Sequence, residues 1–268
     1  MLKDVTLGQY FPGNSLIHRL DPRTKLIALI VYIIVLFTAG GWLSYGLVFA
    51  FLSVCIGVSK VPLKAFMRGM KPLLLILIFT GILNLFFTPG ETVLVSFWRI
   101  TLTKEGLIRA IFMMARILLL ISGTFLLTYT TSPISLTDGL ESLLGPLKKL
   151  RLPVHELSMM MCIALRFIPT LIEETGKIMS AQKARGADFE SGSLMKRMKA
   201  LVPILVPLFI SAFRRADELA TAMECRCYHG GEGRTKMKLL RYKRCDYLTF
   251  LALPVLLAAV IVMVNFGL

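Results

Sequence analysis

The sequence predicts an all-α integral membrane protein with about five transmembrane helices and a further region of three long amphipathic helices. Hydrophobic residues make up 56% of its 268 residues, above the roughly 45–50% of soluble domains. They come in blocks separated by stretches rich in Lys and Arg, which give the chain a formal net charge of +15. Such cations collect beside membrane spans because their charge resists translocation.

Five apolar blocks are candidate membrane spans, because crossing the hydrocarbon takes about 20 mostly apolar residues. They cover residues 26–39, 42–58, 72–88, 107–130 and 247–268. The first two meet at Gly40–Gly41, which predicts a helical hairpin. The fourth contains Arg116, and a charge inside a span indicates either a functional contact or a structural pairing with another helix.

The basic residues predict the topology. Lys60, Lys64, Arg68 and Lys71 form a predicted loop that the positive-inside rule places in the cytoplasm. We therefore expect a cytoplasmic N-terminus, a cytoplasmic region 131–246 and an external C-terminus. The predicted domains are a membrane domain of four helices at 1–130, a helical domain at 131–246 and a last transmembrane helix at 247–268.

Residues 131–246 have charges every few positions along their apolar segments, and start and stop signals predict three helices. Ser135 and Asp138 resemble a capping box that opens a helix to about residue 150. A second helix is predicted over 153–185, ending at Gly186, and a third over 193–228. The apolar run 201–212 contains two prolines and has basic flanks, which favours an amphipathic helix at the membrane interface over a span.

Several functions have no support in the sequence. The chain has no GxxxxGK[ST] loop for ATP, no HExxH zinc pair and no GxSxG nucleophile. No nucleic-acid motif accompanies the basic charge. Five cysteines without a CxxC pair suit a reducing compartment. We expect neither a catalytic site nor a cofactor or metal. Cys225, Cys227 and His229 are possible soft ligands, but their alternate positions do not share one helix face.

The ends of the second and third predicted helices look alike. They read AQKARG at 181–186 and AMECRC at 222–227, each with an arginine between two small residues. The small neighbours allow a partner surface to approach, and the guanidinium can donate two hydrogen bonds to a carboxylate. The alternative is that Arg185 and Arg226 only complement the negative end of the helix dipole.

These motifs, in the contexts QKARGADF and AMECRCYHGGEGRTK, resemble the signature of the transmembrane subunit of energy-coupling factor transporters. LDPRTKL at 20–26, SPISLTDGLE at 132–141 and LRFIPTLIEE at 165–174 agree with it. The resemblance covers nearly the whole chain. One departure is Cys-Arg-Cys at 225–227, where the family commonly has Ala-Arg-Gly.

The resemblance implies a multi-pass protein of a bacterial or archaeal cell membrane, with long cytoplasmic coupling helices. Two ATP-binding-cassette ATPases would dock on the signature arginines and bind ATP and Mg²⁺ themselves. A substrate-binding membrane protein, the S component, would carry a vitamin or trace metal and rest on the coupling helices. Matched by motif, the docking residues are Ala184, Arg185, Gly186, Cys225, Arg226 and Cys227.

The apolar faces of the coupling helices are the expected platform for the S component. Methionine adapts its shape readily, so we assign the platform to Met159, Met160, Met161, Leu205 and Leu208. Ordinary helix packing explains these residues equally well. The alternative function is a membrane-embedded lipid-modifying enzyme, for which the acidic pairs 173–174 and 217–218 are candidates. Paired acids on a basic amphipathic helix are more simply explained by solvent or salt bridges, which favours the scaffold.

Overall fold

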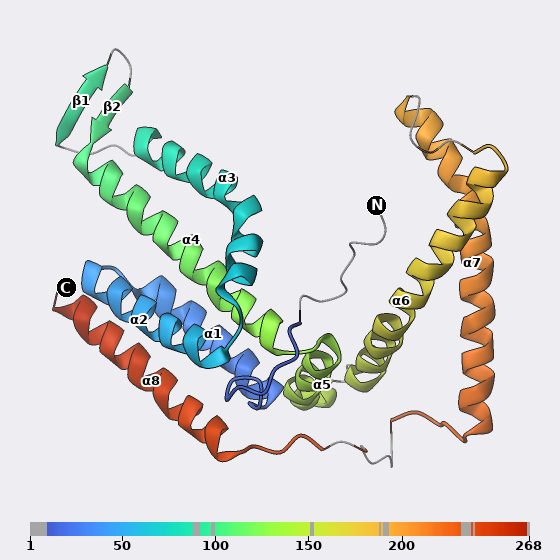
Figure 1. Cartoon of the computed structure of the whole chain (residues 1–268). Helices are drawn as coiled ribbons and strands as arrows, with labels where there is room; N and C mark the ends of the chain where they lie inside the picture. The colour runs from blue at the N-terminus through green and yellow to red at the C-terminus, as the bar shows by residue number, and fades with distance from the viewer. Residues whose placement is uncertain are drawn as a thin grey trace. The chain divides into compact units, whose positions relative to one another are not determined.

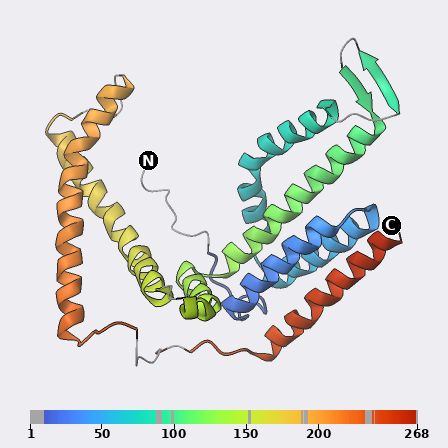
Figure 2. The same ribbon diagram turned by 180° about the vertical axis from the view of Figure 1, so that it is seen from behind.

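The computed structural model describes residues 10–87, 92–97, 100–150, 153–187, 189, 193–231, 237 and 239–266. The chain divides into two compact units. The first, here the membrane unit, contains residues 8–140 and 240–268. The second, here the coupling unit, contains residues 141–239. Figures 1 and 2 show both units as predominantly helical, as the sequence predicts.

The membrane unit is built from five long helices. They are α1 (Pro22–Thr38), α2 (Trp42–Ser59), α3 (Leu63–Phe87), α4 (Lys104–Thr130) and α8 (Arg244–Asn265). α1 packs against α2, α4 and α8, and α3 packs against α4. The last helix therefore returns to lie beside the first (Figure 1), although the predicted domains set it apart as 247–268.

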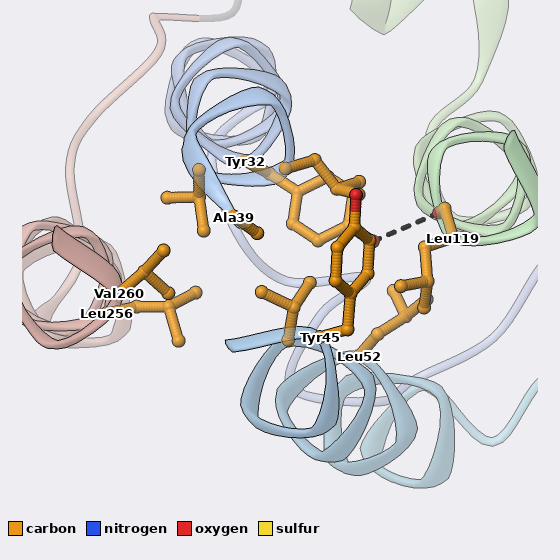
Figure 3. Packing of buried hydrophobic residues seen from close by; sticks show 10 residues of the cluster. Tyr32, Ala39, Tyr45, Leu52, Leu119, Leu256 and Val260 are labelled. Atoms are coloured by element: carbon orange, nitrogen blue, oxygen red, sulfur yellow. Dashed lines mark hydrogen bonds between the residues drawn. The ribbon is translucent and has the colours of Figure 1, made fainter. Parts of the chain in front are cut away.

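A buried cluster from α1, α2, α4 and α8 forms the core of the membrane unit (Figure 3). Tyr32 is 5% exposed, and its hydroxyl donates a hydrogen bond of 3.0 Å to the carbonyl oxygen of Leu119. Gly123 lies against the same ring, because a Cβ built there would be 2.5 Å from Tyr32 Cε1. A glycine on α4 thus makes room for the tyrosine of α1.

A buried polar cluster joins the beginnings of α1 and α8. The Asp246 carboxylate, fully buried, accepts hydrogen bonds from the backbone N–H of Asp21 at 2.8 Å and of Lys243 at 2.7 Å. Asp21 in turn caps α1 by accepting from the N–H of Arg23, and Pro22 occupies the first turn. The LDPRTKL segment is therefore a helix start, and α1 begins four residues before the predicted span.

Among the described residues, α2, α3, α4, α6 and α8 are long and apolar enough to cross a membrane. The number agrees with the predicted five, but the set differs. α1 has 17 residues, which at 1.5 Å per residue extend about 26 Å, short of roughly 30 Å of hydrocarbon. α6, which we predicted to be cytoplasmic, has 31 residues and meets both criteria.

The prediction of a basic loop before the third span is wrong. The helix begins at Leu63, so Lys64, Arg68 and Lys71 lie on its first turns rather than in a loop. Pro72 is inside the helix, where it removes a backbone donor and bends the axis, as Figure 1 shows. Between α3 and α4, β1 (Val93–Phe97) and β2 (Ile100–Thr103) pair antiparallel.

The region that follows α4 contains α5 (Pro133–Leu144), the 3₁₀ helix η2 (Gly145–Leu150), α6 (Val154–Ala184) and α7 (Leu194–Cys225). Ser132, not Ser135, caps α5, because its hydroxyl accepts from the N–H of Ser135 at 3.2 Å. The predicted Ser135–Asp138 capping box is one turn too late. α7 ends at Cys225, three residues before the predicted end. The cytoplasmic placement of 131–246 stays a prediction.

Candidate functional site

Arg185 is the C-cap residue of α6. The next residue, Gly186, has a φ of +87°. The N–H of Gly186 donates to the carbonyl of Lys183, and the N–H of Ala187 donates to the carbonyl of Gln182, both at 3.0 Å. These two bonds define a Schellman motif, in which a left-handed residue closes the helix end.

The end of α7 has the same geometry. Arg226 is the C-cap residue, and Cys227 has a φ of +55°. The N–H of Cys227 donates to Glu224 at 2.8 Å, and that of Tyr228 donates to Met223 at 3.1 Å. The departure Cys-Arg-Cys therefore leaves the Schellman geometry unchanged.

Both arginines and their small neighbours are exposed, namely Ala184, Arg185, Gly186, Cys225, Arg226 and Cys227. A left-handed residue turns the chain away directly after each guanidinium, so the backbone does not continue past it as helix. The local negative charge of the helix C-terminus favours a cation at this position. Each helix end thus presents an arginine that a carboxylate-bearing surface can reach.

α6 and α7 contact each other where they cross (Figures 1 and 2). The Glu174 carboxylate accepts a hydrogen bond from the Ser211 hydroxyl and one from Arg215 Nη2 at 2.8 Å. Its side chain is 23% exposed. Salt bridges or solvent were the expected environment of Glu173 and Glu174, and the specific partners of Glu174 were not predicted. The agreement of LRFIPTLIEE with the family signature was the available signal.

A second polar cluster lies where α6 begins. Glu141 accepts a hydrogen bond of 2.9 Å from the Ser158 hydroxyl, and it lies 3.2 Å from His155 Nδ1. Gly231 approaches the same imidazole, since a Cβ there would be 2.6 Å from His155 Cδ2. The segment after α7 therefore returns to the start of α6. Sequence reasoning did not identify this cluster, because its members are spread over 91 positions, from 141 to 231.

The predicted platform residues have mixed exposure. Met160 is 55% exposed, Met161 38% and Leu205 46%, whereas Met159 and Leu208 are half-buried. α7 has a longer exposed apolar stripe than predicted, and Leu208 lies outside it. The stripe consists of Met198, Leu201, Val202, Leu205, Val206, Phe209 and Phe213. Spacings of three and four residues align these side chains on one helix face.

Arg116 is enclosed by groups from α1 and α2 and is half-buried. Its Nε donates to the Tyr45 hydroxyl at 2.9 Å, and its Nη2 donates to the carbonyl of Ala39 at 3.3 Å. Its guanidinium also lies 5.4 Å from the centroid of the Phe37 ring. Of the two alternatives, these contacts support a structural pairing with neighbouring helices, with neutral acceptors rather than a carboxylate.

The structure also places the residues of the rival metal and enzyme sites. Within the described ranges, no group of three or more His, Cys, Asp and Glu side chains is placed to hold a metal ion. Cys225 and Cys227 are exposed thiols. Asp217 and Glu218 are exposed, and Glu174 is engaged by Arg215. Asp217 and Glu218 therefore face solvent, and Glu174 belongs to the network with Ser211 and Arg215.

Known proteins similar to this chain match it over most of its length. A family model described as cobalt transport protein, CbiQ, matches residues 13–237. The energy-coupling factor transporter transmembrane protein EcfT of Acidaminococcus fermentans is 55% identical to the chain, over 96% of the chain and 97% of its own length. The proteins of that name from Listeria innocua and Bacillus subtilis are 50% and 49% identical over the same shares.

Proposed function

Because this chain belongs to the CbiQ family, as an energy-coupling factor transporter transmembrane protein, we propose that it transmits ATP-driven motion between other subunits. It is a multi-pass membrane protein and a transmembrane component of such a transporter. In the proposed complex, two ATP-binding-cassette ATPases bind and hydrolyse ATP with Mg²⁺. The chain itself needs no cofactor and passes their motion to an S component that binds a vitamin or another micronutrient.

The observation that supports ATPase docking most directly is that α6 and α7 end with the same backbone geometry. Two long helices that are not sequence repeats end in the same Schellman motif with arginine as the C-cap. One such arginine is common, because cations suit helix C-termini. Two exposed arginines with matching local backbones suit two similar partner surfaces, such as the grooves of two related ATPases. Planar guanidinium groups would pair with carboxylates there.

The exposed apolar stripe of α7 supports the proposed contact with the S component. Seven apolar side chains, each at least 46% exposed, form one continuous face. Large exposed apolar patches indicate a protein or membrane contact. We assign this face, with Met160 and Met161, to the S component. ATPase docking also requires that residues 131–246 and the N-terminus face the cytoplasm, with the C-terminus outside.

The test is affinity purification of the tagged full chain from native membranes, with its partners identified by mass spectrometry. We compare the unaltered chain with an Arg185→Glu/Arg226→Glu variant. The matched control is Lys177→Glu/Lys199→Glu, which makes the same charge change at exposed positions inside α6 and α7. We expect two ATPases with the unaltered chain and the control, and their loss with the arginine variant. Equal recovery of ATPases with all three would disprove docking at these arginines.

A further inference from the structure

We propose that the first turns of α3 bind the headgroups of anionic phospholipids. The site is here called the α3 cationic face and consists of Lys64, Arg68 and Lys71, with Lys60 in the turn just before the helix. It is independent of ATPase docking, since it lies in the membrane unit and not in the coupling unit.

The three helical cations share one side of α3. They are four and three residues apart, which places them on the same face of a helix. The opposite face is held against α4. There, Phe66 is 4% exposed and lies 5.1 Å, between ring centroids, from Tyr129. Gly69 allows an even closer approach, because a Cβ there would be 2.7 Å from the Tyr129 hydroxyl. This packing fixes the rotation of the helix and directs the cations outward.

The positive charge is not neutralised by the chain's own carboxylates. No Asp or Glu occurs between Pro22 and Gly90. All four cations are exposed, and no described carboxylate forms an ion pair with any of them. A row of cations without local acids creates a positive potential that attracts phosphate groups. Solubility alone would not require this, because a mixture of exposed acidic and basic residues serves it equally well.

Apolar side chains beside the cations place the site at a membrane surface. Leu63 is 66% exposed and Met67 is 71% exposed, and neither has a protein neighbour that removes it from solvent. Helices that lie at the interface combine such apolar residues with Lys and Arg, so that chains insert into the lipid while cations meet headgroups. Beyond Pro72, α3 continues as an apolar helix. Clusters of four or more cations directly beside a span are typical of anionic lipid sites.

The test uses the full chain in a mild nonionic detergent and native mass spectrometry, with phosphatidylglycerol or phosphatidylcholine added. We expect the unaltered chain to retain phosphatidylglycerol about tenfold better than phosphatidylcholine. A Lys64→Gln/Arg68→Gln/Lys71→Gln variant should lose this preference. The matched control is Lys177→Gln/Lys196→Gln/Lys199→Gln in the coupling unit, which should keep it. An equal affinity of the unaltered chain for both lipids, or a preference that survives in the α3 variant, overturns the proposal.

Three further measurements distinguish lipid from free phosphate, guard against misfolding and test the electrostatic character of the site. Millimolar inorganic phosphate should leave the bound phosphatidylglycerol in place, since the exposed apolar residues also contribute; displacement by phosphate alone overturns a lipid site. A Lys64→Arg/Arg68→Lys/Lys71→Arg variant keeps all charges and should keep the preference. For the unaltered chain, raising the ionic strength should lower the preference, because salt screens exposed charges. A preference that does not respond to salt contradicts the electrostatic site.

Discussion

Arg185 and Arg226 occupy equivalent backbone positions, each as the C-cap of a long helix and each followed by a residue in the left-handed region. The following residue is Gly186 in one case and Cys227 in the other. Glycine adopts a positive φ without steric penalty, whereas other residues pay roughly 1–2 kcal/mol. The same geometry is therefore maintained at α7 against a local strain that α6 does not have.

We predict that Cys227→Gly stabilises the end of α7 by about 1 kcal/mol, because it removes that strain. Cys225→Gly is the matched control: Cys225 is the last residue of the helix proper, where glycine should destabilise by about 0.5–1 kcal/mol. Amide hydrogen exchange over 222–228 measures both changes as local opening free energies. Equal slowing or equal acceleration of exchange in the two variants would contradict the explanation.

Asp246→Ala should destabilise the membrane unit by about 1–3 kcal/mol. The substitution removes the acceptor for the N–H of Asp21 and of Lys243, and a buried donor without a partner is costly. Denaturant unfolding in detergent micelles measures the free energy. Glu218→Ala, at an exposed acid, should have almost no effect. A loss no larger than that of the control would mean that water replaces the carboxylate.

Gly123→Ala should destabilise the chain by about 1–3 kcal/mol, because the added methyl group overlaps the Tyr32 ring. Loss of the Tyr32–Leu119 hydrogen bond should accompany it. Gly46→Ala is a control in another helix of the same unit, since no atom beyond the adjoining residues and the backbone of that helix lies within 4 Å of the methyl position there. Thermal unfolding of both variants in the same detergent gives the comparison. A similar midpoint for the two would show that Tyr32 moves aside freely.

Tyr45→Phe should destabilise the chain by about 1.5–3 kcal/mol, since it leaves Arg116 Nε without the hydroxyl acceptor. The matched control is Tyr247→Phe, because Tyr247 is 65% exposed. A double-mutant cycle with Arg116→Leu measures the coupling between the two side chains. Additive effects in the cycle would show that the hydrogen bond contributes no stability.

Helix positions were predicted well where the signal was local. Pro153 and Gly186 bracket α6 closely, and Gly40–Gly41 separates α1 from α2. The first residue of α5 was harder to predict from capping signals. Ser132 and Ser135 are both suitable N-caps, and only the folded backbone shows that Ser132 is used. At α3, charge at 64, 68 and 71 indicated a loop, although a helix displays the same residues on one face.

The candidate site was predictable in its residues but not in its geometry. The two arginines and their neighbours follow from the repeated small–Arg–small pattern, whereas a positive φ at Cys227 has no sequence signal, since cysteine rarely adopts it. Long-range partners were also missed. Glu174 meets Arg215 across 41 positions, and Arg116 meets Tyr45 across 71. Such pairings depend on how helices pack, which one sequence does not encode locally.

The bond between Asp21 and Asp246 has a consequence for biosynthesis. The two residues are 225 positions apart, so at roughly 5–20 residues per second α1 emerges about 10–45 seconds before its partner. Until α8 is made, the backbone N–H of Asp21 needs a hydrogen bond to water, and the face of α1 that packs on α8 is uncovered. Only a completed chain closes this contact. A chain that lacks α8 therefore leaves the N–H of Asp21, and the face of α1 that packs on α8, without their partners.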